Sequence, residues 1–266
     1  MDAFHRSPFA PRSRADVAIP DELERTIEVA LLHHGIDAAT VERHPDSTIV
    51  PKSTEGDEGG ERAIGLLGEL AAATTISQKL ELHGTIGEGG MGIVRLGTQR
   101  SLSRQVAVKT IKPEVKCERS TIKLLREAWI TGSLEHPNVV PIYDVALEED
   151  GSPLIVLKRI EGTGWDRLIH DAETVKNDFG AEDLLEWNLQ ILMQVCNAVH
   201  FAHSRGVLHR DLKPENVMIG EFGEVYLVDW GIAVSLRDDE TGRLPLAKDA
   251  LELAGTPLYM APEMLG

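Results

Sequence analysis

The sequence predicts an α+β fold with two lobes, a small antiparallel β lobe that contains one helix and a larger, mainly helical lobe. Short apolar strand patterns separated by turns recur between residues 80 and 160, with a single helical pattern among them. A long helical pattern and two further short strand patterns follow. The chain has 266 residues, 42% of them hydrophobic, which is enough to build a real core in one large or two modest domains.

Residues 1–75 are expected to form an N-terminal extension that is partly disordered and holds one or two short helices. Residues 1–20 are rich in Pro, Arg and Ser, which is typical of a disordered leader. Residues 21–35 carry apolar side chains at helical spacing and end on a glycine, so they predict a helix. The turn-rich stretch 44–61 indicates a linker, and the Ala/Leu-rich segment 62–73 is a candidate second helix.

A catalytic domain is expected over residues 78–266, with the small lobe at 78–160 and the start of the large lobe at 161–266. In the small lobe the alternating patterns predict strands near residues 80–86, 93–96, 105–109, 139–145 and 154–160, and a helix over 118–134. In the large lobe, Leu185, Leu189, Leu192, Cys196 and Val199 repeat at helical spacing and predict a long helix that ends near Gly206. Short strands are expected at Val217–Ile219 and Val225–Val228.

The charge balance excludes some classes of partner. Lys and Arg number 27 against 43 Asp and Glu, a formal net charge of −16. Binding to nucleic acid or to anionic lipid needs basic patches, so neither partner is expected. No apolar stretch is long enough to cross a membrane. Cys117 and Cys196 are too few for a disulfide framework, which favours a reducing, cytoplasmic location.

A glycine cluster, Gly87–Gly92, has the letters GEGGMG and lies between two predicted strands. A dinucleotide-binding loop would need a helix directly after the glycines, whereas Ile93 and Val94 continue as a strand. In a hairpin, glycines let backbone amides close over phosphates. Taken alone, the cluster fits a flexible hairpin turn equally well.

Lys109 ends the apolar strand pattern over residues 105–109, and Glu127 lies on the predicted helix. Burying an ammonium group requires a compensating anion, so the two side chains are a candidate ion pair that would direct the lysine toward nucleotide phosphates. The alternative is two unrelated surface charges.

The string His209–Asn216, with the letters HRDLKPEN, places Asp211, Lys213 and Asn216 on one loop after the long helix. A carboxylate can accept or orient a hydroxyl proton, an ammonium can neutralise a phosphoryl group, and an amide oxygen can bind Mg²⁺. A salt-bridged turn is the alternative, and the full eight-residue string argues against it.

Asp229 directly follows the last predicted strand, in the triplet Asp229-Trp230-Gly231, and could hold a metal that bridges phosphates. About 25 residues later come Gly255–Glu263, with the letters GTPLYMAPE. In this order the motifs resemble the protein-kinase signature set. More closely, the chain resembles the bacterial, eukaryotic-like (Hanks-type) serine/threonine protein kinases, because Lys213 and Gly255-Thr256 favour Ser/Thr over Tyr specificity.

This resemblance, which covers residues 78–266, implies a two-lobed protein-kinase-like fold and transfer of the ATP γ-phosphoryl group to Ser/Thr hydroxyls of proteins, the chain itself included. The implied cofactors are ATP and Mg²⁺, with Mn²⁺ as the alternative ion. The implied catalytic residues are Asp211, Lys213 and Lys109. The implied metal ligands are Asn216 and Asp229. The implied nucleotide-binding residues are Ile86, Gly87, Glu88, Gly89, Gly90, Met91, Gly92, Ile93, Val94, Ala107, Lys109, Glu127, Leu157, Ile160 and Met218.

The resemblance also implies regulation. Arg210, before the catalytic Asp211, suggests pairing with a phosphorylated activation loop, and Thr241, Ser235 and Thr256 are the first candidates for that phosphate. Thr256 would also help to align the substrate hydroxyl. Two positions depart from the family pattern. Trp230 replaces the usual phenylalanine, and Gly164 lies where the family often offers a side chain to the ribose.

The chain stops three residues past Glu263, whereas the resemblance implies several further helices. It is therefore expected to be an incomplete kinase that exposes the apolar floor of its large lobe. The alternative function is a truncated fragment or pseudokinase that binds nucleotide or partners without turnover. The sequence carries no signal for an oligomeric state.

Overall fold

The computed structural model describes residues 41–43, 49–51, 79–238, 243–250 and 253–264. The helices expected over residues 21–35 and 62–73 lie outside these ranges. Within the expected linker, β2 (Ile49–Pro51) pairs antiparallel with β1 (Val41–Arg43). The turn-rich composition did not predict this short strand pair.

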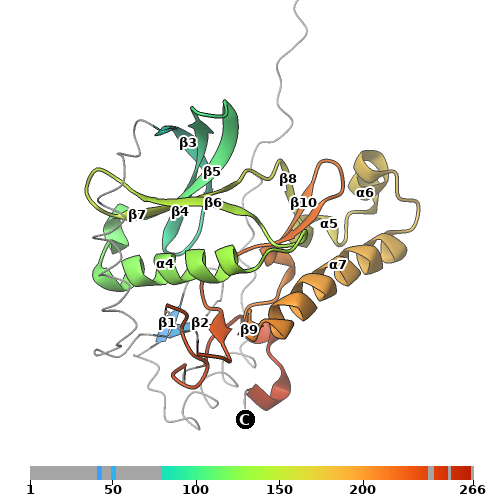
Figure 1. Cartoon of the computed structure of the whole chain (residues 1–266). Helices are drawn as coiled ribbons and strands as arrows, with labels where there is room; N and C mark the ends of the chain where they lie inside the picture. Colours follow the sequence, from blue (N-terminus) through green and yellow to red (C-terminus); the bar gives the residue numbers. More distant parts are fainter. Residues whose placement is uncertain (1–40, 44–48, 52–78, 239–242, 251–252, 265–266) are drawn as a thin grey trace, which may run out of the picture.

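The small lobe is a five-stranded antiparallel sheet in the order β3-β4-β5-β7-β6 (Figure 1). Its strands are β3 (Leu80–Glu88), β4 (Gly92–Gln99), β5 (Arg104–Ile111), β6 (Ile142–Leu147) and β7 (Pro153–Lys158). The predicted antiparallel sheet is thus confirmed. The bounds of β6 and β7 differ by up to three residues from the expected strands at 139–145 and 154–160. The apolar runs in the sequence extend past the residues that pair in the sheet.

Alternation along β5 decides what faces each side of this sheet. Val106 and Val108 are fully buried on one face, in a cluster with Leu80, Leu154 and Val156. Ile111 lies in a separate cluster with Leu124 and Ala128 of the helix α4 (Glu118–Ser133). Since successive side chains of a strand point to opposite faces, Lys109 lies on the α4 face together with Ile111.

The helix α4 begins after Cys117, whose backbone N–H donates to the Ser120 hydroxyl at 3.0 Å. It contacts β5, β6 and β7 of the sheet. The helix is confirmed at the predicted place and ends before His136-Pro137, because proline disfavours helical geometry in the residue before it. Glu127 is buried on this helix.

The large lobe begins at a three-residue connection, 159–161, after β7 (Figure 1). Its helical elements are α5 (Trp165–Leu168), α6 (Ala172–Phe179) and α7 (Leu184–Ser204), with 3₁₀ turns η3 (Pro214–Asn216), η4 (Pro257–Tyr259) and η5 (Pro262–Met264). Its strands are β8 (Gly162–Gly164), β9 (Val207–Leu208), β10 (Val217–Gly220), β11 (Val225–Leu227) and β12 (Val234–Ser235). The strands β11, β10 and β8 form one sheet, and β12 pairs with β9. In the described part of the chain, no helix is both long and apolar enough to cross a membrane.

The predicted long helix is α7, but the face of α7 that is buried is not the apolar stripe that predicted the helix. Leu185, Leu189 and Leu192 are 69%, 51% and 43% exposed. The buried face carries Trp187, Ile191, Val195, Ala198 and Ala202. It belongs to the main core cluster and contacts β9 and β11. The helix therefore has two apolar faces. The leucine spacing in the sequence marks the face that is exposed among the described residues, and the other face is buried.

Sequence reasoning missed the short elements α5, α6, β8, β9 and β12. Strands of two or three residues and a four-residue helix leave no readable period. The described α6 is nevertheless well capped, because the Asp171 side chain accepts a hydrogen bond from the Thr174 backbone N–H at 3.0 Å and Gly180 ends the helix in a left-handed conformation.

Candidate active site

The glycine cluster forms the turn between β3 and β4. Gly87 pairs with Val94, and the backbone N–H of Gly89 donates to the Gly92 carbonyl at 2.9 Å. A Cβ on Gly92 would lie 3.2 Å from the Thr110 carbonyl oxygen and 3.3 Å from Cε of Lys109. Gly92 therefore leaves the space through which the Lys109 side chain passes.

The remaining residues predicted for nucleotide binding are spread over both lobes. Ile86 is 52% exposed near the end of β3, and Ala107 of β5 pairs with Leu157 of β7. Glu88, Gly90, Met91 and Ile93 lie in or beside the glycine turn, Val94 lies opposite Lys109 on β4, Ile160 lies in the connection after β7, and Met218 lies on β10 of the large lobe.

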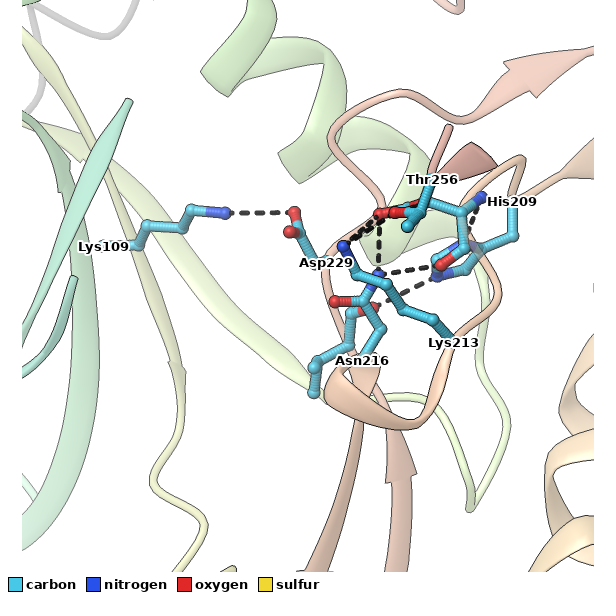
Figure 2. Close-up of polar contacts among 8 residues, drawn as sticks. Lys109, His209, Lys213, Asn216, Asp229 and Thr256 are labelled. Carbon is cyan, nitrogen blue, oxygen red and sulfur yellow. Dashed lines mark hydrogen bonds and ion pairs between the residues drawn. The ribbon is translucent and has the colours of Figure 1, made fainter. Parts of the chain in front are cut away.

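Lys109 joins the small sheet to α4 and to the large lobe. Its Nζ donates to Oε1 of Glu127 at 2.6 Å and lies 3.6 Å from Oδ1 of Asp229. Figure 2 shows the Lys109 ammonium group pointing directly at the Asp229 carboxylate. Asp229 follows β11 in a left-handed backbone conformation with φ of 60°. The predicted Lys109–Glu127 pair is formed, and these three residues from three elements meet at one place.

The electrostatics of this group keep it charged. Burial acts to lower the pKa of Lys109, but the carboxylates of Glu127 and Asp229 outweigh it and raise that pKa above its ordinary value. Lys109 in turn lowers the pKa of Asp229. Burial raises the pKa of Glu127, and the Lys109 ammonium opposes that effect. The buried amine is therefore cationic and the more exposed Asp229 carboxylate is anionic.

Residues of the loop His209–Asn216, together with Thr256, form a buried network around the carboxylate of Asp211, which is 4% exposed. Asn216 Nδ2 donates to the Asp211 backbone carbonyl at 2.8 Å and to Oδ2 at 3.0 Å. Lys213 Nζ lies 3.2 Å from Oδ2, and the Thr256 hydroxyl donates to Oδ1 at 2.7 Å. Three side chains thus fix the Asp211 carboxylate, and Figure 2 shows these three, Asn216, Lys213 and Thr256, close together.

Thr256 connects this network to the end of the described chain. Lys213 Nζ donates to its hydroxyl at 3.0 Å. The preceding Gly255 has φ of 123°, and a Cβ there would lie 2.5 Å from the Arg210 carbonyl oxygen. Glycine is required here because any side chain would meet both a strained backbone and this carbonyl. Close packing of residues 255–256 on the catalytic loop places the Thr256 hydroxyl on Asp211.

His209 is a site residue to which the sequence analysis gave no role, although it stands in the HRDLKPEN string. It is 2% exposed. The Asp211 backbone N–H donates to its Nδ1 at 3.2 Å, so the neutral ring carries its proton on Nε2 and donates to the Val228 carbonyl at 3.1 Å. Its ring lies 4.5 Å from Trp230. His209 thus fastens the loop of Asp211 to the strand end that carries Asp229.

Asn216 and Asp229 carry the donor atoms expected of metal ligands. The Asn216 nitrogen is engaged by Asp211, so the oxygen on the other side of the planar amide is directed away from that carboxylate. Asp229 is ionised, and its side chain is 54% exposed. Carboxylate and amide oxygens are hard ligands that suit Mg²⁺ and Mn²⁺. The residues present therefore fit a divalent cation.

Two of the three candidate phosphate acceptors are buried. Ser235 is 3% exposed and donates to the Arg237 carbonyl at 2.7 Å, and Thr256 is 6% exposed. In this conformation neither hydroxyl is accessible to a phosphorylating enzyme. Thr241 lies outside the described residues. Arg210, the expected partner of such a phosphate, is half-buried and has a left-handed backbone conformation with φ of 70°.

Gly164, where the family often has a side chain, lies beside the carboxylate of Asp166. A Cβ at Gly164 would lie 2.3 Å from Oδ1 of Asp166, so a larger residue there would require only that this flexible side chain shift. The space near the start of α5 therefore already contains a polar side chain, and spacing along the sequence did not reveal it.

Comparisons with known proteins agree with this arrangement. A family model described as the protein kinase domain matches residues 80–266. The serine/threonine-protein kinase PknD of Chlamydia trachomatis (serovar L2b) is 35% identical over 209 residues, which cover 71% of this chain and 22% of the relative. PknD of Protochlamydia amoebophila is 36% identical over 197 residues, with 67% and 20% covered. The chain spans about a fifth of the length of these curated relatives.

Proposed function

Since the chain belongs to the protein kinase family, among the bacterial Hanks-type serine/threonine kinases, we propose that it transfers the γ-phosphoryl group of ATP to Ser and Thr hydroxyls of proteins. Autophosphorylation is part of this proposal. The observation that carries it is the position of Lys109, which is held by Glu127 at 2.6 Å while it lies 3.6 Å from Asp229 of the large lobe. A cation and a metal-ligand carboxylate from two lobes then face one small volume, as binding of a polyphosphate requires.

In this proposal Asp211 accepts or orients the proton of the attacking hydroxyl. Its carboxylate is held by Asn216, Lys213 and Thr256, so little reorganisation is needed when a substrate hydroxyl arrives. Lys213, which is 9% exposed, provides a positive charge beside Asp211 for the transferring phosphoryl group. The Thr256 hydroxyl, which bonds to both residues, lies where a substrate hydroxyl would have to approach.

We assign nucleotide binding to residues of both lobes. The glycine turn provides backbone amides for the phosphates, and Lys109 provides a cation for the α- and β-phosphates. Val94, Ala107 and Leu157 lie on the adjoining strands β4, β5 and β7, and Met218 lies on β10 of the large lobe; all four are apolar residues that suit the adenine ring. Asn216 and Asp229 would hold Mg²⁺, with Mn²⁺ as the alternative, and such an ion neutralises phosphate charge when bound. The cytoplasm is the proposed compartment, where ATP is available and where the free thiols of Cys117 and Cys196 stay reduced.

The test is transfer of labelled γ-phosphate from ATP to the chain itself and to a basic protein substrate. Asp211→Asn should lower the rate by about 10²–10⁴-fold, because it removes the acceptor of the hydroxyl proton. Asp178→Asn is the matched control, since it makes the same charge change on an exposed position of α6 and should keep the rate.

Equal labelling by the wild-type chain and the Asp211→Asn variant would contradict the kinase proposal. Tight binding of Mg²⁺-ATP without any transfer would instead establish the pseudokinase alternative. Nucleotide binding is therefore measured beside transfer in both variants.

A further inference from the structure

The connection between the lobes begins at a lysine. β7 ends at Lys158, residues 159–161 follow, and β8 already lies in the β11-β10-β8 sheet of the large lobe. The backbone N–H of Lys158 donates to the Pro141 carbonyl at 2.9 Å, which ties the end of β7 to the start of β6. Lys158 is thus the last residue held by the small sheet.

The side chain of Lys158 crosses from this sheet to the large lobe. Its Nζ donates a hydrogen bond to the hydroxyl of Tyr226 on β11 and lies 4.7 Å from the centre of that ring. Tyr226 is 7% exposed and its position is fixed by strand pairing with Met218. A flexible ammonium side chain of one lobe is therefore held by a rigid, buried ring of the other.

The surroundings favour the charged form of Lys158. The hydrogen bond that Lys158 Nζ donates to the Tyr226 hydroxyl is the largest effect that raises the pKa of Lys158 above its ordinary value, and Glu224 and Tyr143 add to it. Tyr143 itself stacks with Arg104, whose guanidinium carbon lies 3.7 Å from the ring centre. That second pair lies wholly within the small sheet, on β6 and β5.

A second contact between the lobes lies one residue along β11. Leu227 accepts a hydrogen bond from the Val140 backbone N–H at 3.4 Å and donates to the Asn138 carbonyl at 2.7 Å. Residues 138–140 connect α4 to β6. One contact alone would let the small lobe turn about it, whereas two contacts on the same strand restrain that rotation.

We propose that Lys158 and Tyr226 form an interlobe latch, a positioning pair that fixes the small sheet against the large lobe and thereby presets the spacing between Lys109 and Asp229. The latch acts on the nucleotide site through geometry, without touching the nucleotide. The expected effect of the latch on nucleotide binding rests on the proposed kinase function. Its expected effect on the segments 138–142 and 157–161, which connect the lobes, does not.

Four variants and one control test the latch in the 266-residue chain. Tyr226→Phe removes only the hydroxyl and keeps the ring, Lys158→Met removes the charge, and the double variant removes both. Lys176→Met is the matched control, because it removes the same charge from an exposed residue of α6, whose ion pair with Glu182 lies within the large lobe. Lys158→Arg keeps a cationic donor and should restore wild-type behaviour.

Two measurements are made on each variant. The first is amide hydrogen exchange of residues 138–142 and 157–161, which should become about 3- to 10-fold faster when a charge-assisted hydrogen bond is lost. The second is the Kd of a fluorescent ATP analogue with Mg²⁺, which should rise by a similar factor because the two lobes are no longer held in place. KM for ATP should rise while the rate at saturating ATP changes less than about twofold.

The double variant should behave like either single variant, since both remove one interaction. Two outcomes would overturn the latch. One is that hydrogen exchange at residues 138–142 and 157–161 is unchanged in Tyr226→Phe, and the other is that the effects of the two single variants add in the double variant. Failure of the wild-type chain to bind the nucleotide analogue would refute the proposed function alone, because the exchange measurement would still decide whether the latch exists.

Discussion

Trp230 lies between the metal-ligand candidate Asp229 and Gly231, and it is only 1% exposed. Its ring packs on His209, yet its indole N–H has no hydrogen-bond partner among the described residues. Trp165, by contrast, is 8% exposed and donates from Nε1 to Asn188 at 2.7 Å. The packing role expected of an aromatic residue at position 230 is met, and the indole nitrogen adds an unpaired buried donor.

Trp230→Phe should therefore change the free energy of unfolding by less than about 1 kcal/mol, because removing the unpaired donor offsets the lost packing. Trp165→Phe should cost about 2–3 kcal/mol, since it loses packing and leaves Asn188 without its partner. Urea unfolding of both variants measures the difference. A larger loss for Trp230→Phe than for Trp165→Phe would contradict this account.

His209 makes stability depend on pH. Burial lowers its pKa, the facing carboxylates Asp229 and Asp211 oppose this effect, and Lys213 adds to it. A lowered pKa means that the unfolded chain binds the proton more readily. The contribution of His209 to stability is then fully present above its unfolded pKa of about 6.5 and is lost as pH falls through the folded value.

The free energy of unfolding should thus decrease from pH 7 to pH 5, by at most about 1.4 kcal/mol per pH unit for one proton. His209→Gln should flatten this slope, whereas Gln at the exposed His83 should keep it. Urea unfolding at four pH values between 5 and 7 gives the slopes. Equal slopes for the wild type and His209→Gln would refute the role of this histidine.

The long helix α7 illustrates how one element can be apolar on two faces. Ile191 is 3% exposed in the main core, while Leu189, two positions earlier, is 51% exposed. Residues two apart on a helix do not face the same side, so the two stripes meet different surroundings.

Ile191→Ala should cost about 2–4 kcal/mol of unfolding free energy, because it opens a cavity in the core. Leu189→Ala should cost below about 1 kcal/mol, since little apolar surface is buried there. Both variants shorten an apolar side chain on the same helix and can be compared by their urea midpoints. Equal losses would show that Leu189 is covered as well as Ile191.

At the scale of the whole molecule, contacts from several elements connect the two lobes. Lys109 reaches Asp229, Lys158 reaches Tyr226, and residues 138–140 pair with Leu227. The main core cluster includes Ile130, Leu134 and Val139 from the end of α4 and the chain after it, so part of the small lobe is packed into the large one. The end of α4 and the chain after it are thus anchored in the core of the large lobe.

Much of the fold could be predicted, because strand alternation and helical spacing are local properties. The five-stranded sheet, α4 and α7 are confirmed, and Lys109 forms the predicted ion pair with Glu127. Residues whose roles depend on distant partners could not be found this way. His209, Tyr226 and Trp165 have no periodic signal, since each is defined by a contact made from another element.

The order of the elements and the chemical groups on the motif loops can be inferred from the amino acids alone, because backbone preference and side-chain chemistry belong to each residue. Three features follow from the folded chain instead: the face of α7 that is buried, the contact of the Thr256 hydroxyl with Asp211, and the reach of Lys158 from one lobe to the other. Burial and hydrogen bonding are shared between segments, so they depend on distances that no single segment contains.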